Sequence, residues 1–503
     1  MTQKYPLGLQ DFEEIREGNY LYIDKTEYIL SLVNSDKYCF LSRPRRFGKS
    51  LFISTLDCFF QGKKTLFKNL YIEDKCDWTK KNPVIRISFS NIGHSEKGLS
   101  KAIYDELNTI ASKYEISLTE DALSSRLKEL IHKLQPLGKV VILFDEYDKP
   151  ILDYLGKNNA LAIQNRDTLK AFYSVLKDAD RYLEFVFITG VTKFSKVSIF
   201  SELNNLTDLT LHPKYGGICG ITQDELAHYF KEELPNYDLA EIKRWYNGYT
   251  WDLETKVYNP FSLMGFFSQG KFKNFWFESG TPSFLVNLML DYSLYNAEST
   301  EVDSVIISDF NIEKLNPFAV LFQAGYVTLA DYDAIGDLYT LILPNLEVKR
   351  SLETVILNAY RSLAEDGSVS IVKKLHNSLK NNQLADLKEI FNTIFGALPY
   401  DLWDAKREKS YHAIIHLTFM LAGMYAQSEV HTTKGRLDAM MEYDDKIFLF
   451  EFKLNKSAEE ALAQIETKDY ARRFKDSGKS CIGIGINFWQ SKREVEGIIW
   501  KEL

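Results

Sequence analysis

The chain has 503 residues, of which 45% are hydrophobic and 26% are charged, as is typical of a soluble globular protein. At roughly 150 residues per domain, this length predicts two to four domains with well-buried cores. The formal net charge is −8, which excludes a chain-wide positive field for nucleic acid, so any basic patch must be local.

The cysteine pattern indicates a reducing compartment, and the hydropathy of the chain predicts no membrane span. The five cysteines are scattered without a C-x-x-C pair, which argues against a disulfide framework or a thiolate zinc site. The first residues lack the apolar core of a signal peptide. No apolar run reaches the ~18 residues of a membrane span, and the longest candidate, 413–426, contains His416. We therefore expect a cytoplasmic protein without a membrane partner.

A phosphate-binding loop is predicted near the N-terminus. The apolar run 38–41 is followed by Arg43-Pro44-Arg45-Arg46-Phe47-Gly48-Lys49-Ser50 and then by a helix-like run, 51–60. Strand, tight loop, Gly-Lys-Ser and helix is the order of a P-loop, in which backbone N–H groups at a helix N-terminus cradle phosphates. Lys49 would reach the terminal phosphates and Ser50 would hold Mg²⁺. One position departs from the pattern, because Arg43 replaces its first glycine.

An acidic pair follows the next predicted elements. The run 83–89 alternates like a strand, and 97–115 and 119–134 are predicted helices. The run 140–146 has five apolar residues followed by Asp145 and Glu146, which favours a Walker B strand in a parallel sheet. Asp145 would bind the Mg²⁺ shell, and Glu146 would activate or orient the attacking water.

The acidic pair has a simpler interpretation, a solvated strand end, but the P-loop upstream favours the functional one. A strand between the two motifs, with Glu directly after Asp, indicates the branch of P-loop ATPases with an added strand and a catalytic Glu. A further strand, 183–188, leads to Thr189, which could sense the γ-phosphate or could be a helix cap or turn residue. The predicted nucleotide-binding residues are Arg45, Arg46, Phe47, Gly48, Lys49, Ser50, Leu51 and Asp145.

Several motifs together resemble a known family. They are Pro6-Leu7-Gly8, Tyr22-Ile23-Asp24-Lys25-Thr26, Arg43 to Ser50, Phe144-Asp145-Glu146-Tyr147-Asp148-Lys149-Pro150 and Trp245-Tyr246-Asn247-Gly248-Tyr249. They look like the bacterial family of predicted AAA-type ATPases whose members carry a C-terminal nuclease-like domain of the PD-(D/E)xK superfamily. The resemblance covers nearly the whole chain. It implies that arginine at the glycine position is usual, so Arg43 is no sign of an inactive site.

The middle of the chain carries less chemistry. Thr222 and Glu225 form a capping-box pattern that opens a helix to about Glu233. The aromatic, turn-rich runs 245–249 and 258–262 resemble the lid or winged-helix part of these ATPases. Their aromatic residues could pack between small helices and a hairpin, or could stack on nucleic acid. Residues 286–395 are predicted to be mainly helical, with a small β portion near 326–343.

A second constellation lies in the last hundred residues. A predicted helix, 405–425, places Glu408, His412 and His416 on one face. Strands are predicted at 435–441, 447–453 and 481–487, with a turn at 443–446 and a helix carrying Ala458, Ala461 and Ile465. The two histidines lack a third matched metal ligand, so we favour packing or hydrogen bonding for them.

The register of this hairpin brings carboxylates together. If the turn centres on Asp444-Asp445, Asp438 sits opposite Glu451, with Cβ atoms about 5 Å apart. Glu451 and Lys453 then share a face. Two facing carboxylates repel each other unless a cation neutralises them, and Mg²⁺ is the natural candidate. The metal would activate water and stabilise the charge of phosphodiester cleavage, and Lys453 could position the water or stabilise that charge.

The order of these residues matches the PD-(D/E)xK pattern, with Leu437 in place of its proline. By resemblance, the nuclease positions are Glu408, Asp438, Glu451, Lys453 and Gln464; Glu146 is the catalytic residue of the ATPase, and Ser50, Asp145, Asp438 and Glu451 are the metal ligands. Glu-Phe-Lys alone is a weak signal, so an inactive relic is the alternative. Nearby basic residues could contact phosphates or form an ordinary solvated surface; they are Lys434, Arg436, Lys456, Lys468, Arg472 and Arg473.

The sequence therefore predicts an α/β protein with two activities. The expected parts are a P-loop NTPase core with an AAA/ASCE-type parallel sheet at 1–208, a lid or winged-helix-like region at 209–285, a helical linker at 286–395 and a restriction-endonuclease-like domain at 396–503. With ATP and Mg²⁺ as cofactors, the chain would hydrolyse ATP and cut nucleic acid, DNA in preference to RNA, under control of the ATPase. A homo-oligomer is compatible with this organisation.

Two alternative functions stay open at this point. One is a nucleotide-controlled switch or assembly protein whose tail binds nucleic acid without cutting it. The other is a chain in which Arg43 blocks nucleotide entry and only the tail is active.

Overall fold

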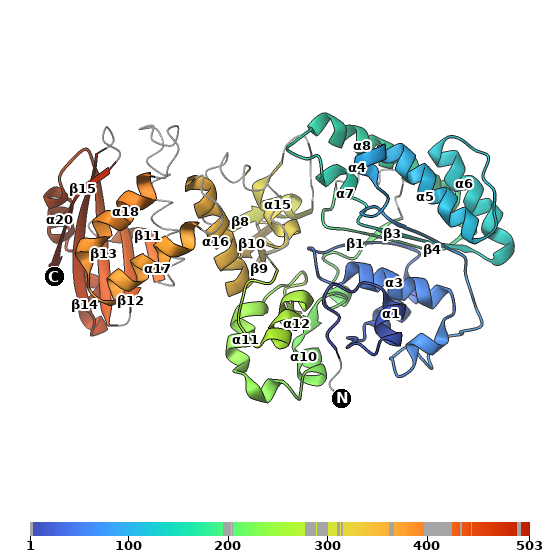
Figure 1. Cartoon of the computed structure of the whole chain (residues 1–503), viewed down its shortest axis with the longest axis horizontal. Helices are drawn as coiled ribbons and strands as arrows, with labels where there is room; N and C mark the ends of the chain where they lie inside the picture. Colours follow the sequence, from blue (N-terminus) through green and yellow to red (C-terminus); the bar gives the residue numbers. More distant parts are fainter. Residues whose placement is uncertain are drawn as a thin grey trace. The chain divides into compact units, whose positions relative to one another are not determined.

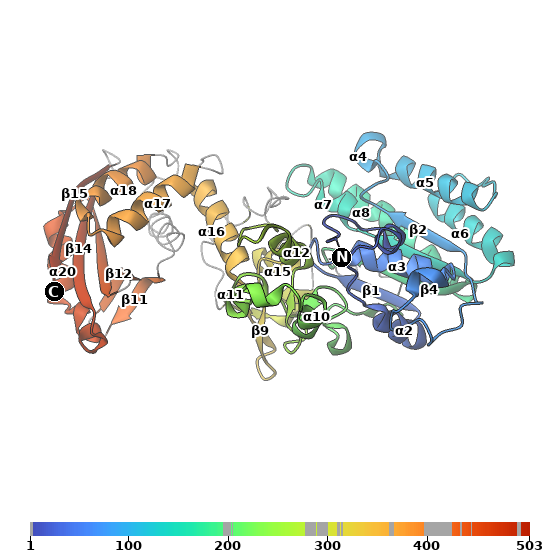
Figure 2. The same cartoon turned by 60° about the horizontal axis from the view of Figure 1, so that its bottom comes forward.

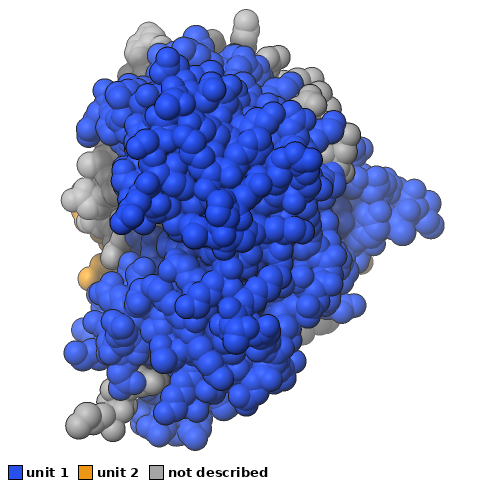
Figure 3. All heavy atoms as spheres, turned by 90° about the vertical axis from the view of Figure 1, so that its right-hand side faces the viewer, with its two compact units in different colours: residues 1–285, 297–349 blue, residues 286–296, 350–503 orange. Residues whose placement is uncertain are grey.

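The computed structural model describes residues 4–194, 203, 205–276, 288, 300–308, 312, 315–361, 367–396, 425–432, 435–443, 445–489 and 494–503 (Figure 1). The chain folds as two compact units: unit 1 comprises residues 1–285 and 297–349 (blue in Figure 3), and unit 2 comprises residues 286–296 and 350–503. The predicted division into four parts is finer than this one and stays a prediction. Within the predicted linker, residues 297–349 belong to unit 1 and the remainder to unit 2.

A parallel sheet forms the centre of unit 1. Its strands are β1 (Tyr38–Ser42), β2 (Val84–Ser88), β3 (Val140–Asp145), β4 (Leu183–Gly190) and β5 (Thr207–Asp208), in the order β2-β3-β4-β1-β5. Strand β4 lies between the P-loop strand β1 and the acidic strand β3, as expected for an ATPase with an added strand. Strands β1 and β3 are buried along their whole length, which explains their continuous apolar sequence.

Helices cover both faces of this sheet (Figure 1). Helices α1 (Phe12–Glu17) and α3 (Lys49–Phe60) lie on one face, and α5 (Leu99–Lys113), α6 (Leu123–Leu134) and α8 (Asn159–Tyr173) lie on the other. Helix α5 buries Leu99, Ile103, Leu107 and Ile110, the periodic apolar residues of its sequence. The predicted helices at 97–115 and 119–134 are thus confirmed by α5 and α6. The other helices of this part are α2 (Thr26–Ser35), α4 (His94–Lys97), α7 (Lys149–Leu152) and α9 (Val175–Asp178).

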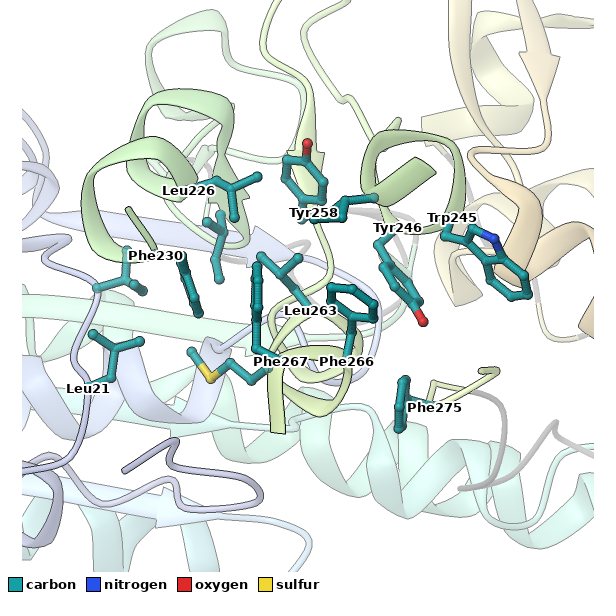
Figure 4. Close-up of a cluster of buried hydrophobic side chains, with 14 residues drawn as sticks. Leu21, Leu226, Phe230, Trp245, Tyr246, Tyr258, Leu263, Phe266, Phe267 and Phe275 are labelled. Atoms are coloured by element: carbon teal, nitrogen blue, oxygen red, sulfur yellow. The ribbon is translucent and has the colours of Figure 1, made fainter. Parts of the chain in front are cut away.

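Three small helices and a two-stranded sheet form the 209–276 part of unit 1. They are α10 (Gln223–Tyr229), α11 (Leu239–Tyr246), α12 (Pro260–Gln269), β6 (Ile221–Thr222) and β7 (Val257–Tyr258). Both bonds of the predicted capping box between Thr222 and Glu225 are present. Figure 4 shows aromatic side chains of these helices packed together, with Phe230 stacked on Phe267 at 4.6 Å between ring centroids.

The aromatic motif residues of this region are buried. Trp245 is 8% exposed, and Tyr246, Tyr249 and Tyr258 are 0–1% exposed. Their rings are therefore enclosed by protein, and of the two alternatives left by the sequence the structure has them packing between small helices and a hairpin.

The rest of unit 1 contains a second, antiparallel sheet. Its strands are β8 (Thr300–Asp303), β9 (Thr328–Asp333) and β10 (Leu338–Ile342), in the order β8-β10-β9, with α14 (Ser304–Ser308) and α15 (Pro317–Ala324) beside them. The predicted β portion near 326–343 is confirmed.

Unit 2 is a mixed sheet with helices. Helix α16 (Leu346–Arg361) begins in unit 1 and continues into unit 2, where α17 (Gly367–Lys380) and α18 (Leu387–Gly396) follow. The sheet contains β11 (Tyr425–Thr432), β12 (Gly435–Tyr443), β13 (Lys446–Leu454), β14 (Ser480–Trp489) and β15 (Glu494–Glu502), in that spatial order. Strands β13 and β14 are parallel and are connected through α20 (Ala458–Thr467), and the other neighbouring strands are antiparallel.

The three predicted strands of unit 2 are confirmed, whereas β11 and β15 were not predicted. The predicted helix 405–425 lies outside the described residues except for Tyr425, which begins strand β11, so the helix prediction is wrong at that residue. Within the described residues, no helix combines the length and the apolarity needed to cross a bilayer.

Candidate functional sites

The predicted phosphate-binding loop lies between β1 and α3. Gly48 has a φ of +97°, a left-handed conformation that favours glycine, and a Cβ built there would meet no heavy atom within 4 Å. The space in front of the loop is therefore open beside the N-terminus of α3, whose first N–H groups have no partner inside the helix. The backbone N–H groups at this open cradle are the donors that a phosphate needs.

Lys49 is buried at the floor of this loop. Its ammonium donates to the carbonyl oxygens of Arg43, at 2.8 Å, and Pro44, at 3.0 Å. Burial lowers the pKa of Lys49, while the nearby carboxylates of Glu146 and Asp145 act in the opposite direction. A buried ammonium at an open loop is a natural partner for an anion.

Asp145 and Glu146 lie at the carboxyl end of β3. Asp145 is 2% exposed and accepts a hydrogen bond from Thr189 Oγ1 at 2.7 Å. Burial raises the pKa of Glu146, and Lys49 lowers it. Glu146 has a φ of +50°, an uncommon backbone conformation for a residue with a side chain.

Thr189 lies within strand β4, so it is neither a helix cap nor a turn residue. Its hydrogen bond to Asp145 joins the ends of β3 and β4. Sensing of the γ-phosphate by Thr189 stays a prediction.

Asp148 is a site residue for which the sequence analysis assigned no role. Its carboxylate accepts from the backbone N–H of Val191 at 2.9 Å and from the N–H and hydroxyl of Thr192 at 2.6 Å each. Burial raises its pKa, and the hydrogen bonds from Thr192 lower it. Asp148 thus fixes the segment after β4 to the loop after β3. Its position as the third acid of the Asp-Glu-Tyr-Asp run was the only local signal.

Arg43 points away from the open side of the loop. Its guanidinium donates to the carbonyl oxygens of Ser42, at 2.9 Å, and Thr210, at 2.8 Å, and also to Tyr215 O at 3.2 Å. It lies 4.2 Å from the centroid of the Trp251 ring, and burial lowers its pKa to about 10. Arg43 is 1% exposed. The side chain therefore braces the loop against the 210–251 segment.

Two more predicted nucleotide-binding residues contact the 209–276 part of unit 1. Phe47 is buried edge-on against Tyr249 and Trp251, at 4.8 and 5.3 Å between ring centroids. The Arg46 guanidinium lies 3.7 Å from the centroid of the Phe261 ring. Arg45 is exposed, and Ser50 and Leu51 are half-buried in the first turn of α3.

An apolar cavity of about 70 Å³ adjoins Gly48 and Leu51. Its walls come from the N-terminal segment and from the helical part of unit 1, including Pro6, Ile23, Ile218 and Met264. The cavity thus lies next to the open loop and has the apolar lining that a planar base requires.

The second site lies on the β12–β13 hairpin of unit 2. The predicted register is confirmed by five residue pairs, from Ala439↔Phe450 to Tyr443↔Lys446. One residue further along, the Asp438 carboxylate accepts from the backbone N–H of Phe452 at 2.8 Å. Asp438 therefore lies beside Glu451, as its effect on the pKa of Glu451 also shows.

Glu451 is the most enclosed group of this site, at 1% exposure. Lys453 donates to Glu451 Oε1 at 2.9 Å, and the Gln464 amide of α20 donates to the same oxygen. Glu451 Oε2 is buried without a hydrogen-bond partner among the described residues. Burial and the neighbouring Asp438 raise the pKa of Glu451 to about 7, while Lys453 opposes this shift.

Tyr470 was missed in the sequence analysis. It is 2% exposed and forms a hydrogen bond with Gln464, whose amide donates to Glu451. Lys456, Lys468 and Arg472 are exposed. Glu408, His412, His416 and Lys434 lie outside the described residues, as do the side chains of Arg436 and Arg473.

Comparison with known proteins agrees with these two sites. A family model described as a predicted AAA-ATPase matches residues 6–200, and a model of the PD-(D/E)XK nuclease superfamily matches residues 406–497. An uncharacterized protein in the vnfD 5′ region of Azotobacter chroococcum mcd 1 is 38% identical over 516 residues, which cover 100% of this chain and 99% of that protein.

The chain belongs to the family of predicted AAA-ATPases with a C-terminal PD-(D/E)XK nuclease-superfamily domain. No solved structure matches it. The AAA-ATPase match contains the P-loop, Asp145 and Glu146, and the PD-(D/E)XK match contains Asp438 and Glu451.

The PD-(D/E)XK site of this chain fits a divalent cation. Among the described residues, no three His, Cys, Asp or Glu side chains are placed together as a metal cluster. Mg²⁺, however, binds through one or two carboxylates and retains several waters. Asp438 and the unpartnered Oε2 atom of Glu451 offer this kind of site. In the AAA-ATPase part, Ser50 and Asp145 offer the oxygen ligands.

Proposed function

We propose that this chain binds and hydrolyses ATP in unit 1 and cleaves a phosphodiester of nucleic acid in unit 2, with Mg²⁺ at both sites. The nuclease proposal rests on the environment of the Glu451 carboxylate. Its carboxylate is buried beside Asp438, its pKa is raised to about 7, and one oxygen has no partner among the described residues. Such a pair is unfavourable for folding alone and becomes favourable when a cation neutralises it.

The residues of unit 2 have distinct roles in this proposal. Asp438 and Glu451 hold the cation, which supplies Lewis-acid stabilisation of the negative charge that develops on the phosphate. Lys453 is fixed on Glu451 and can place its ammonium against the scissile phosphate. Gln464 holds the carboxylate of Glu451 in one orientation. The exposed Lys456, Lys468 and Arg472 can contact the backbone of the nucleic acid, and DNA is favoured over RNA.

The residues of unit 1 form a complete nucleotide site in the same proposal. The N-terminus of α3 and Lys49 bind the phosphates, and Ser50 with Asp145 holds Mg²⁺. Glu146 orients the attacking water. The base would lie against the apolar residues beside Gly48 and Leu51. The braced position of Arg43 leaves the loop open, which disfavours the alternative in which this side chain blocks nucleotide entry.

The nuclease is tested by cleavage of labelled single- and double-stranded DNA and RNA. The wild-type chain should cut with Mg²⁺ and not with EDTA. Asp438→Asn and Lys453→Met should each lower the rate by about 100-fold or more, because the cation or the positive charge at the phosphate is lost. Glu459→Gln, an exposed acid of α20, is the matched control and should cut like wild type.

Absence of cleavage on every substrate would overturn the nuclease. If ATP were still hydrolysed, that result would favour a nucleotide-controlled switch with a non-cutting tail. Equal cleavage by wild type and Asp438→Asn would place the active site elsewhere.

The nucleotide site is tested by titration with a fluorescent ATP analogue. Lys49→Ala should lower the affinity by about 100-fold or more, because the ammonium faces the phosphates. The exposed Lys64→Ala variant is the matched control and should bind like wild type. Unchanged binding by Lys49→Ala would contradict a functional P-loop.

A further inference from the structure

A hairpin formed by β9 and β10 extends away from the body of unit 1 (Figure 2). Its turn, residues 334–337, carries Ile335, which is 99% exposed. Val305, 61% exposed, follows Ser304, whose hydroxyl donates to Asp337 of the same turn at 2.6 Å. The hairpin therefore presents one exposed apolar side chain, Ile335, at its apex, and the exposed Val305 of α14 follows the residue that bonds to this turn.

The apex has a fixed conformation. The Asp333 carboxylate accepts from the backbone N–H groups of Ile335, at 3.0 Å, and Gly336, at 3.2 Å. Asp337 has a φ of +51° and also accepts from the Tyr332 hydroxyl at 2.8 Å. The turn thus holds Ile335 outward before any partner binds, which reduces the entropy lost on docking.

The charge of this apex is of one sign. The described residues 300–308 and 315–342 contain no lysine or arginine, and their carboxylates are those of Glu301, Asp303, Asp331, Asp333 and Asp337. An acidic apex repels nucleic acid and anionic lipid. It fits a basic protein surface with an apolar pocket.

Unit 1 itself carries a groove of this kind, along the free edge of β2. The groove measures about 780 Å³ and has an apolar floor that includes Ile92 and Ile110. Leu137, 57% exposed, stands at its side. Its charged lining is Lys81, Arg86 and Lys113 against Asp57 and Glu106, and Asp57 is paired with Arg86 at 3.4 Å. The lining of the groove therefore includes buried apolar residues and one more basic than acidic side chain.

The edge of β2 can also receive a strand. Because hydrogen-bonding alternates along a parallel strand, Pro83 and Phe89 bond to β3 while residues 84, 86 and 88 face outward. The Tyr114 hydroxyl accepts from the outward Val84 N–H at 2.8 Å. The N–H and C=O of Arg86 and the N–H of Ser88 then face the groove, as in proteins that bind an added strand.

We propose that the hairpin apex of one copy docks into the β2-edge groove of a second copy, with Ile335 on the apolar floor and its carboxylates against Lys81 and Lys113. The two surfaces lie apart on unit 1 (Figure 2), so one copy cannot satisfy its own groove. The contact is head-to-tail. Such a contact repeats into a closed ring or an open filament rather than ending at a two-fold dimer.

Sedimentation velocity of the full-length chain tests this interface. Wild type should assemble with concentration, and Ile335→Gln and Lys113→Glu should each weaken assembly by about tenfold or more, since each removes one complementary surface. Neither substitution touches the core, because both side chains are exposed. Leu239→Gln on α11 and Lys128→Glu on α6 are matched exposed controls and should assemble like wild type.

A mixture of the two variants identifies the head-to-tail geometry. Each variant keeps one intact surface, so the Lys113→Glu hairpin can still occupy the Ile335→Gln groove. The mixture should form a one-to-one dimer and nothing larger. A wild-type chain that stays monomeric at all concentrations would overturn the proposal, as would variants that assemble like wild type or a mixture that forms no dimer.

Discussion

The side chain of Arg43 is enclosed where the P-loop pattern has glycine. It donates to main-chain carbonyl oxygens on both sides of the loop and lies over the Trp251 ring. The two Nη atoms of this buried guanidinium are paired, whereas its Nε has no hydrogen-bond partner among the described residues. The nucleotide-binding loop is thus braced by a residue that does not itself face the open cradle.

Arg43→Gly restores the P-loop pattern and tests this account. We expect a loss of about 3 kcal/mol in the free energy of unfolding, because buried carbonyl oxygens lose their donors, and no gain in ATP affinity. Denaturant unfolding and nucleotide titration measure the two quantities. Arg45→Gly, at an exposed arginine of the same loop, should change stability by about 0.5 kcal/mol or less. Tighter ATP binding without a loss of stability would revive the blocked-loop alternative.

Tyr470 supports the second site through Gln464. We expect Tyr470→Phe to raise the Mg²⁺ concentration needed for half-maximal cleavage by about tenfold, because Gln464 loses the partner that orients it toward Glu451. The ring itself is kept, so the thermal stability should change little. The measurement is the Mg²⁺ dependence of the initial rate. A lower rate at an unchanged Mg²⁺ requirement would show that Tyr470 acts only through packing.

Residues that act together across short distances in the chain were predicted well. Glu451 and Lys453 lie two apart on one strand, and the turn fixes Asp438 beside them, so pattern and spacing were sufficient. Thr210 and Tyr215, which accept from Arg43, lie more than 160 residues further along the chain, and the partners of Asp148 lie in the segment after β4. Local pattern carries no information about such contacts, because they depend on how the elements pack.

At the scale of elements, long periodic runs were predicted and weak patterns were missed. Strands β1 and β3 are continuous apolar runs, and α5 has a clear helical period. Strand β15 has an interrupted pattern, Glu-Val-Glu-Gly-Ile-Ile-Trp-Lys-Glu, and only part of it is buried. The strand order β2-β3-β4-β1-β5 likewise follows from packing and not from any single segment.

Helix α16 begins with a buried acid whose ionisation affects stability. Glu347 is 0% exposed, accepts from the Trp276 N–H at 2.9 Å, and has its pKa raised by burial from 4.5 to about 7. The native chain therefore holds this proton over a range in which the unfolded chain has lost it. The contribution of Glu347 is fully present below pH 4.5 and is lost as pH rises through about 7.

Glu347→Gln tests this linkage. Between pH 4.5 and about 7, wild type should lose up to about 3 kcal/mol of unfolding free energy relative to the variant, because the buried carboxylate must ionise. Denaturant unfolding at several pH values, followed by tryptophan fluorescence, gives the difference. A difference that does not vary with pH would contradict the raised pKa. Glu301→Gln, at an exposed acid, is the control.

At the scale of the whole molecule, two sites with different chemistry share one chain. The AAA-ATPase part lies in unit 1 and the PD-(D/E)XK hairpin lies in unit 2. Helix α16 starts at Leu346 in unit 1, where Glu347 bonds to the Trp276 backbone, and continues into unit 2. We expect nucleotide binding to control cleavage, and this continuous helix is one covalent connection between the units.

The most direct test of that coupling is the initial rate of Mg²⁺-dependent cleavage with and without ATP, in wild type and in Lys49→Ala. We expect ATP to change the wild-type rate by about tenfold or more and to leave the Lys49→Ala rate unchanged. Asp438→Asn should show no cleavage in either condition. Cleavage that is equal with and without ATP in wild type would contradict control of the nuclease by the ATPase.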